Sequence, residues 1–343
     1  MMRFLGRSKI LLAALTAGLL LTACGSGPGQ VGAAVITGDQ VVSVTQVQQM
    51  LDKIIKDQPA AQLLAANHRL DLVSRELVSQ LVVHSLLIRA ATDEGLRVDE
   101  EQLGQLVTED KLSQPVSANG SVPPTVLVQQ LAASARDHRE AYTDELLLQQ
   151  LGEKAFHHLA ITFDFTTISL GDPSGDSSTG TGSLRAGSLR ENALSKAQQL
   201  ASGPESEAKI MQADRAAGIG NTGQYLSLQN NDLAGLSTLF GFLPGSVVAF
   251  QPNPQSSSWL IAVVKNRGEN TQQNADQTAD QAPLVTKDYF LSLGRFMLQP
   301  LFNKVGTKIS PRYGVWDPVA MQLAPNESET VGVVLKMKEA VKS

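Results

Sequence analysis

The chain has 343 residues but only one cysteine, Cys24. A single cysteine permits no disulfide within the chain, and once alkylated it offers neither a thiol nucleophile nor a thiolate ligand for a metal. The stability of the fold must therefore come from the burial of apolar side chains.

Histidine is almost as scarce, and it is absent from the second half of the chain. All five histidines lie at or before residue 158: His68, His84, His138, His157 and His158. No metal-ligand spacing of His, Asp and Glu occurs, and neither a Gly-x-Ser-x-Gly nor a Gly-x-x-x-x-Gly-Lys motif is present. Gly218, Gly220 and Gly223 have the spacing of a dinucleotide-binding loop, but they follow a helical pattern and not a strand. We therefore expect no cofactor, no metal site and no assigned catalytic residue.

The charge of the chain is mildly negative, with a formal net value of −5. Residues 1–23 contain three of the 28 basic residues and no acidic ones, so without them 25 basic residues stand against 33 acidic ones, a net charge of −8. Such a surface does not suit nucleic acid. The acidic clusters at 93–94 and 99–101 lie at the ends of helical patterns, where carboxylates serve as solvated caps more often than as catalysts.

The amino terminus has the pattern of a bacterial secretory signal. An apolar run at residues 10–21 is too short to span a bilayer as a permanent helix. Three cations precede this run: Arg3, Arg7 and Lys9. The pattern predicts a signal peptide over residues 1–23.

The signal ends in Leu-Thr-Ala-Cys at residues 21–24, which resembles the lipobox of bacterial lipoproteins. This resemblance implies cleavage before Cys24 and lipidation of that residue, with residues 24–32 as a flexible tether. Acyl chains on Cys24, palmitate among them, would hold the protein on the extracytoplasmic face of the cell membrane. The alternative is an ordinary secretory signal with an incidental cysteine.

Helical patterns dominate residues 33–160, after a short hairpin around Gly38. Thr45 and Gln48 have the spacing of a capping box at the start of the first helix. We expect helices at about residues 45–55, 67–94, 98–109, 124–133 and 135–159. These patterns predict a helical first domain.

The pattern changes at residue 161 to alternating β-branched and aromatic side chains. We expect a strand at 161–168, helices at 190–201 and 205–217, a glycine-rich turn at 218–223, a short helix near 232–239 and a strand at 259–265. This order predicts a small α+β domain over residues 161–268. A polar linker at 269–282, a segment at 283–323 with one amphipathic helix at 285–305, and a polar tail at 324–343 complete the chain.

Two segments carry a resemblance to a known family. Residues 34–47 are similar to the amino-terminal motif of SurA, and residues 310–318, Ser-Pro-Arg-Tyr-Gly-Val-Trp-Asp-Pro, resemble a segment of actinobacterial SurA-like lipoproteins. The order of the segments resembles the SurA and PrsA group of envelope chaperones and foldases. The resemblance implies a mainly α fold with an α+β insert: a helical chaperone module formed by residues 33–160 and 283–323, and a parvulin-like insert.

The same resemblance implies that the insert has lost catalysis. An active parvulin prolyl isomerase carries one histidine on its first strand and another on its last. In the alignment that places residues 220–225 at the family's glycine-rich turn, Thr167 and the neighbourhood of Trp259 stand at those positions. A rival alignment places His157 and His158 at the first-strand motif, although capping of a helix end explains these two as well.

The resemblance therefore implies a chaperone or scaffold whose partners are unfolded or secreted polypeptides. A divergent prolyl isomerase and a lipoprotein with one dedicated partner are the alternatives, and the oligomeric state stays open. Eight apolar residues on the helical faces either form the core or line an exposed groove for clients. They are Met50, Leu51, Ile54, Leu77, Leu81, Phe296, Met297 and Phe302.

Overall fold

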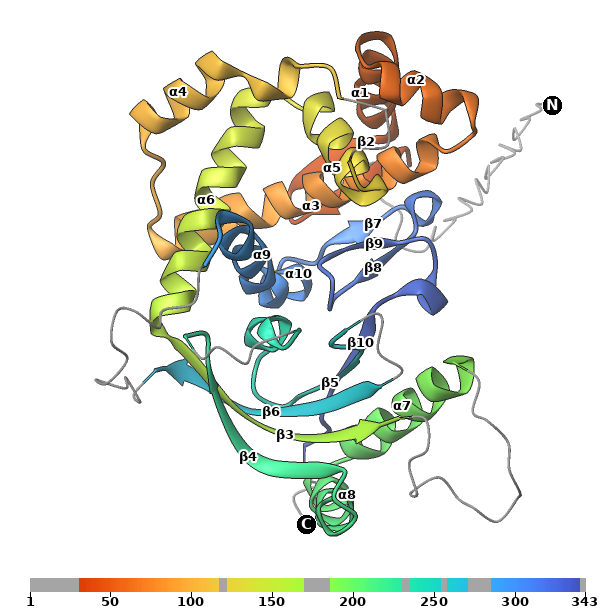
Figure 1. Cartoon of the computed structure of the whole chain (residues 1–343), viewed down its shortest axis with the longest axis vertical. Helices are drawn as coiled ribbons and strands as arrows, with labels where there is room; N and C mark the ends of the chain where they lie inside the picture. Colours follow the sequence, from red (N-terminus) through yellow and green to blue (C-terminus); the bar gives the residue numbers. More distant parts are fainter. Residues whose placement is uncertain are drawn as a thin grey trace, which may run out of the picture.

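The structure is a computed structural model that describes six stretches of the chain. The amino-terminal helices gather at one end of the molecule, and a sheet with two helices beneath it forms the other end (Figure 1). The carboxyl-terminal segment contacts both ends. The chain thus has a mixed fold of α-helices and antiparallel sheets. The described stretches are residues 31–116, 122–169, 186–229, 235–253, 258–270 and 285–339.

A two-stranded hairpin leads directly into the first helix. The Ser43 side chain accepts a hydrogen bond from the backbone N–H of Gln46 at 3.1 Å, and the Gln46 side chain accepts one from the N–H of Ser43 at 2.8 Å. The expected capping box of Thr45 and Gln48 is therefore wrong by two residues, because residue 44 is already helical. The strands are β1 (Ala33–Thr37) and β2 (Gln40–Ser43), and the helix is α1 (Val44–Asp57).

The 25-residue helix α3 lies at the centre of the amino-terminal core. Its side chains Val73 and Leu77 are fully buried, and Gly95 ends it in the left-handed conformation that favours glycine. His157 and His158 occupy the last turn of α6, as the helical pattern predicts. The remaining helices are α2 (Pro59–Ala66), α3 (Leu70–Glu94), α4 (Glu100–Glu109), η1 (Lys111–Ser113), α5 (Pro124–Ala135) and α6 (His138–His158).

The carboxyl-terminal segment packs back onto these helices. Helix α9 lies along α6, and strand β7 extends the hairpin by pairing with β1, with Val35 opposite Ile309. The single helix expected at 285–305 is interrupted at Leu298, one residue before the first turn of α10, where Pro300 fits without a missing hydrogen bond. The elements are α9 (Lys287–Met297), α10 (Gln299–Lys304), β7 (Lys308–Ile309), η4 (Pro311–Tyr313), β8 (Val315–Asp317) and β9 (Gln322–Ala324).

A five-stranded antiparallel sheet in the order β10-β5-β6-β3-β4 forms the other end of the molecule. Two expectations are wrong here. Residues 220–227 form strand β4 and not only a glycine turn, and the tail expected at 324–343 contains strand β10, which pairs along its length with β5. The elements are β3 (Leu159–Ile168), α7 (Ala186–Ala201), α8 (Pro204–Ala216), β4 (Gly220–Ser227), η2 (Ser237–Gly241), β5 (Ser246–Phe250), β6 (Trp259–Glu269), η5 (Glu327–Glu329) and β10 (Gly332–Lys336).

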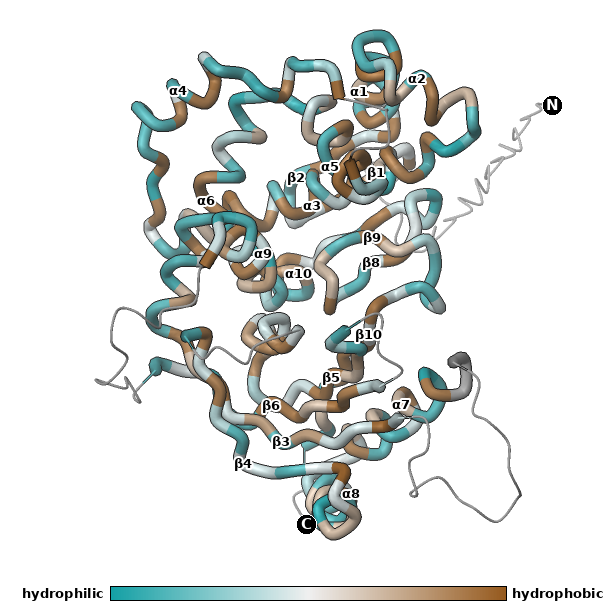
Figure 2. Tube along the Cα trace, viewed as in Figure 1, coloured by the Kyte–Doolittle hydropathy of each residue, from teal (hydrophilic) through white to brown (hydrophobic). Residues whose placement is uncertain are grey.

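Both faces of this sheet are covered. Val247 and Ile261 point toward α7 and α8, whereas their neighbours Val248 and Ala262 pack with Phe240 of η2 and with residues of α6 and α9. Strand β5 and the first six residues of β6 accordingly carry nearly continuous hydrophobic residues (Figure 2). Burial on both sides removes the alternation of polar and apolar residues that marks a sheet with one solvent-facing side.

Residues 310–318 connect the two ends of the molecule. A Cβ on Gly314, whose φ is 112°, would lie 2.1 Å from the carbonyl oxygen of Ala324, so only glycine fits this approach. The buried Asp317 carboxylate accepts hydrogen bonds from the backbone N–H groups of Val319 at 2.9 Å, Ala320 at 3.0 Å and Val331. This segment therefore holds β8 and the approach to β10 in place.

Candidate functional site

The helical end of the molecule contains a cleft of about 740 Å³. Four helices that come from distant parts of the sequence each present one face to it, at the spacing of successive helical turns. The lining residues are Glu76, Gln80 and Val83 of α3, Val126, Gln129, Gln130 and Ala133 of α5, Ala141, Asp144, Glu145 and Leu148 of α6, and Lys287, Asp288, Leu291, Ser292, Arg295 and Phe296 of α9, with Leu112, Arg136 and Ala320 from connecting segments.

A buried ion-pair network holds one wall of this cleft. Arg136 Nη2 donates to Asp144 Oδ2 at 2.5 Å, and His84 Nδ1 lies 2.7 Å from Asp144 Oδ1. Because Arg136 and Asp144 are buried, their charges must compensate one another within the wall. The network joins α3 to α6 and to the end of α5, and it leaves little of its charge for a ligand.

The mouth of the cleft has a second ion pair, between Lys287 of α9 and Glu145 of α6. Two other carboxylates of the lining, Glu76 of α3 and Asp288 of α9, have no cation within ion-pair distance among the described residues. Gln80 Nε2 donates to Glu76 Oε1 at 3.0 Å. Burial raises the pKa of Glu76, and the positive charge of Arg295 and the Gln80 hydrogen bond oppose part of that rise.

Hydrophobic surface lies between these polar groups. Val126 is 37% exposed and Leu112, Leu291 and Phe296 are half-buried, whereas Val83 and Leu148 line the cleft as buried side chains. A cleft with mixed apolar and amide-bearing walls suits a polypeptide better than a small charged ligand. Among the described residues, no group of three or more His, Cys, Asp and Glu side chains is placed to hold a metal ion.

The structure brings only one of the eight apolar candidates, Phe296, into the lining of the cleft. The others belong to the packed core of the helical end or lie half-buried against it: Leu51, Ile54, Leu77 and Leu81 are buried, and Met50, Met297 and Phe302 are half-buried. Phe302 stacks on Trp316 with ring centroids 4.7 Å apart. The cleft itself was missed because its walls are assembled from four separate helices. The sequence signal for the cleft is the pair of polar residues 76 and 80, which lie at helical spacing beside Val83.

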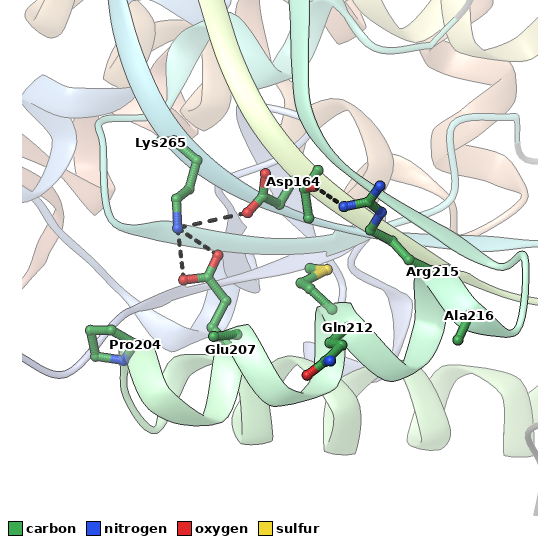
Figure 3. Close-up of a pocket in the computed structure, with 10 residues that line it drawn as sticks. Asp164, Pro204, Glu207, Gln212, Arg215, Ala216 and Lys265 are labelled. Atoms are coloured by element: carbon green, nitrogen blue, oxygen red, sulfur yellow. Dashed lines mark hydrogen bonds and ion pairs between the residues drawn. The ribbon is translucent and has the colours of Figure 1, made fainter.

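A second pocket, of about 660 Å³, lies between α8 and the sheet (Figure 3). Lys265 of β6 points between Asp164 and Glu207, with Nζ to Glu207 oxygen distances of 2.7 and 2.8 Å. Glu207 is buried, so the pair neutralises a carboxylate that α8 carries into the sheet. Arg215 donates to Thr222 Oγ1 at 3.2 Å at the other end of the pocket. These contacts fasten α8 to the sheet.

Thr167 and Trp259, the positions aligned with the parvulin histidines, lie on neighbouring strands, since Ile168 pairs with Trp259. Both side chains are used internally. Thr167 Oγ1 donates to the carbonyl of Ile219 at 3.0 Å, and Trp259 is buried with the guanidinium of Arg190 5.4 Å above its ring. Neither offers a titratable group to a substrate.

Cys24 and the expected signal peptide lie outside the described residues. Within the described stretches, no helix combines the length and the hydrophobicity needed to cross a bilayer. The assignment of a lipid anchor at Cys24 stays a prediction.

No family model matches this sequence, and no curated protein matches it. Among solved structures, the chain is similar to a foldase protein, PrsA, from Lactococcus lactis. The identity is 10%, the match covers 81% of this chain and 95% of that chain, and the TM-score is 0.21. A TM-score this low supports no conclusion about fold or function.

Proposed function

We propose that this protein is a membrane-anchored, extracytoplasmic chaperone or scaffold that binds unfolded or partly folded secreted polypeptides. The observation that carries the proposal is the cleft between α3, α5, α6 and α9, which combines exposed aliphatic surface with side-chain amides. Lipidation of Cys24 supplies the anchor. The resemblance of residues 34–47 and 310–318 to SurA-like proteins favours the same function.

The insert, residues 161–268, serves as a scaffold in this proposal. An X-Pro bond has a rotation barrier of about 18–20 kcal/mol, and lowering it requires an enclosed site that favours the twisted amide. The insert contains no histidine or cysteine. The faces of its sheet are occupied by α7 and α8 on one side and by η2, α6 and α9 on the other. The covered sheet supports a structural role for the insert.

Two assays on one sample of the purified chain test the proposal. The first follows light scattering by an aggregating client, and the second follows prolyl isomerisation in a refolding protein, with an active parvulin as control. We expect slower aggregation and no faster isomerisation. Isomerase activity like that of the control would establish the prolyl isomerase instead, and no effect in either assay would favour a lipoprotein with one dedicated partner.

A further inference from the structure

Some polar side chains of the cleft already form ion pairs within the protein, and others have no partner in it. Four charged side chains of the walls are engaged in ion pairs: Arg136 with Asp144, and Lys287 with Glu145. Among the described residues, Glu76, Asp288 and Arg295 form no ion pair. The side-chain amides of Gln129 and Gln130 are exposed on α5 and have no hydrogen-bond partner among the described residues.

Further unpaired hydrogen-bonding groups lie on other walls of the cleft. The Ser292 hydroxyl of α9 is exposed and has no partner among the described residues. Glu76 of α3 engages only Oε1, with Gln80, and its Oε2 has no hydrogen bond within the described part of the chain. The guanidinium of Arg295 faces Glu76 without a direct ion pair. Three walls thus carry both donors and acceptors that the protein leaves available.

These unpaired hydrogen-bond donors and acceptors suit the peptide groups of a polypeptide main chain in particular. A glutamine amide offers a donor and an acceptor side by side, as does the peptide group it can pair with. The charged side chains left without an ion pair, Glu76, Asp288 and Arg295, are of both signs, so the cleft offers no single charge by which a ligand would be recognised. We infer that the cleft recognises the main chain of an extended client segment, with its amides held by Gln129, Gln130 and Ser292 and its aliphatic side chains placed against Val126 and Leu291. This inference deepens the proposed chaperone function and rests on it.

The dimensions of the cleft set the length of that segment. The lining residues of α9 extend from Lys287 to Phe296, nine residues apart in sequence. At about 1.5 Å per helical residue this is about 13 Å, which equals about four residues of extended chain. Recognition of the main chain over so short a segment makes binding depend weakly on sequence. A general chaperone requires this property.

Peptides with altered backbones test the inference. The probe is a fluorescein-labelled decapeptide of alternating valine and serine, and its partner has three central peptide N–H groups replaced by ester oxygens. The ester removes donors with little change of shape. In fluorescence anisotropy with the purified chain, we expect the ester peptide to bind roughly tenfold more weakly or worse. A decapeptide of the same residues in another order should bind within about threefold of the first.

Variants connect this effect to the cleft. The double variant Gln129→Ala, Gln130→Ala should weaken binding of the normal peptide and reduce the difference between the two peptides. Gln62→Ala, on the exposed surface of α2 away from the cleft, is the matched control and should change neither.

Equal affinity for the amide and ester peptides would overturn main-chain recognition and leave the chaperone proposal intact. If neither peptide binds while the chain still suppresses aggregation of a client, the inference is also wrong, because the client is then held elsewhere. Absence of both peptide binding and aggregation suppression would overturn the inference and the proposed function together.

Discussion

Gly294 of α9 lies so close to α6 that a Cβ atom on it would stand 2.0 Å from the carbonyl oxygen of Leu148. On α6, one turn after Leu148, a Cβ on Gly152 would lie 2.1 Å from the carbonyl oxygen of Phe290, one turn before Gly294 on α9. The two helices therefore touch backbone to backbone, each through a glycine. This contact fixes the distance between two walls of the cleft, although the helices are far apart in the sequence.

The first prediction follows from this contact. Gly294→Ala and Gly152→Ala should each destabilise the protein by about 1–3 kcal/mol or more, because the helices must separate to admit the methyl group. Gly104→Ala is the control, since Gly104 lies in α4 with no atom within 4 Å of an added Cβ. It should be neutral or stabilising by up to about 1 kcal/mol. Urea unfolding followed by circular dichroism measures all three, and equal stabilities would contradict the close packing of α6 and α9.

A second prediction concerns the ion pair that fastens α8 to the sheet. Lys265→Met leaves the buried Glu207 carboxylate without its partner and should cost about 1–3 kcal/mol, less than for a fully buried pair because Lys265 is partly exposed. The double variant Lys265→Met, Glu207→Met should recover most of that loss. Arg139→Met breaks an exposed pair with Glu100 and should cost about 1 kcal/mol at most. A loss for Lys265→Met no larger than for Arg139→Met would show that the pocket contacts do not stabilise the insert.

The third prediction uses the raised pKa of Glu76. A carboxyl whose pKa is higher in the folded state contributes full stability below its unfolded pKa and loses it as the pH rises through the folded value. Glu76→Gln removes this loss, so it should raise the melting temperature at neutral pH, and its advantage should disappear as the pH falls below the ordinary range of a glutamate.

Melting curves between pH 4 and 8 would show the effect. Glu191→Gln, an exposed substitution on α7, is the matched control and should show no such pH-dependent gain. An advantage for Glu76→Gln that grows as the pH falls would have the wrong sign and would contradict burial as the dominant cause.

A fourth prediction tests the anchor. Cells that produce the protein should incorporate labelled fatty acid into it, and Cys24→Ala should abolish both the labelling and the partition into membranes. The folded body should keep its melting temperature, because Cys24 precedes every described element. Labelling that survives Cys24→Ala would refute the lipobox assignment.

Local patterns predict the helices of this chain well and its tertiary pairings poorly. The apolar periodicity of residues 67–94 and the helix end at Gly95 predict α3, because both signals lie within the segment. The sequence pattern predicts a polar tail where strand β10 lies, because its five residues follow a polar stretch and its partner β5 lies more than 80 residues earlier. Pairing with β5 along its whole length, with Val334 opposite Val248 at the centre, makes this short segment a strand.

The cleft is hard to predict from the sequence for the same reason, although polar residues 76 and 80 beside Val83 give a weak local signal. Each wall contributes a few residues that read locally as an ordinary half-polar helix face, such as Gln129 and Gln130 on α5. These residues line a cleft only when α3, α5, α6 and α9 pack together. That packing depends on close contacts such as the one at Gly294. Conversely, Leu77 and Leu81 were candidates for a client surface, but the packing of α3 uses them in the core.

The most direct test of the account fills the cleft and measures client binding. Ala133→Trp places an indole in the cleft from α5, and Ala208→Trp places the same group in the pocket beside α8 as the matched control. The ligand is fluorescently labelled, reduced and carboxymethylated lactalbumin, which cannot fold, and circular dichroism confirms that both variants are folded. Ala133→Trp should weaken binding roughly tenfold or more, whereas Ala208→Trp should leave it within about twofold of the unmodified chain. Unchanged binding by Ala133→Trp would contradict the claim that this cleft holds the client.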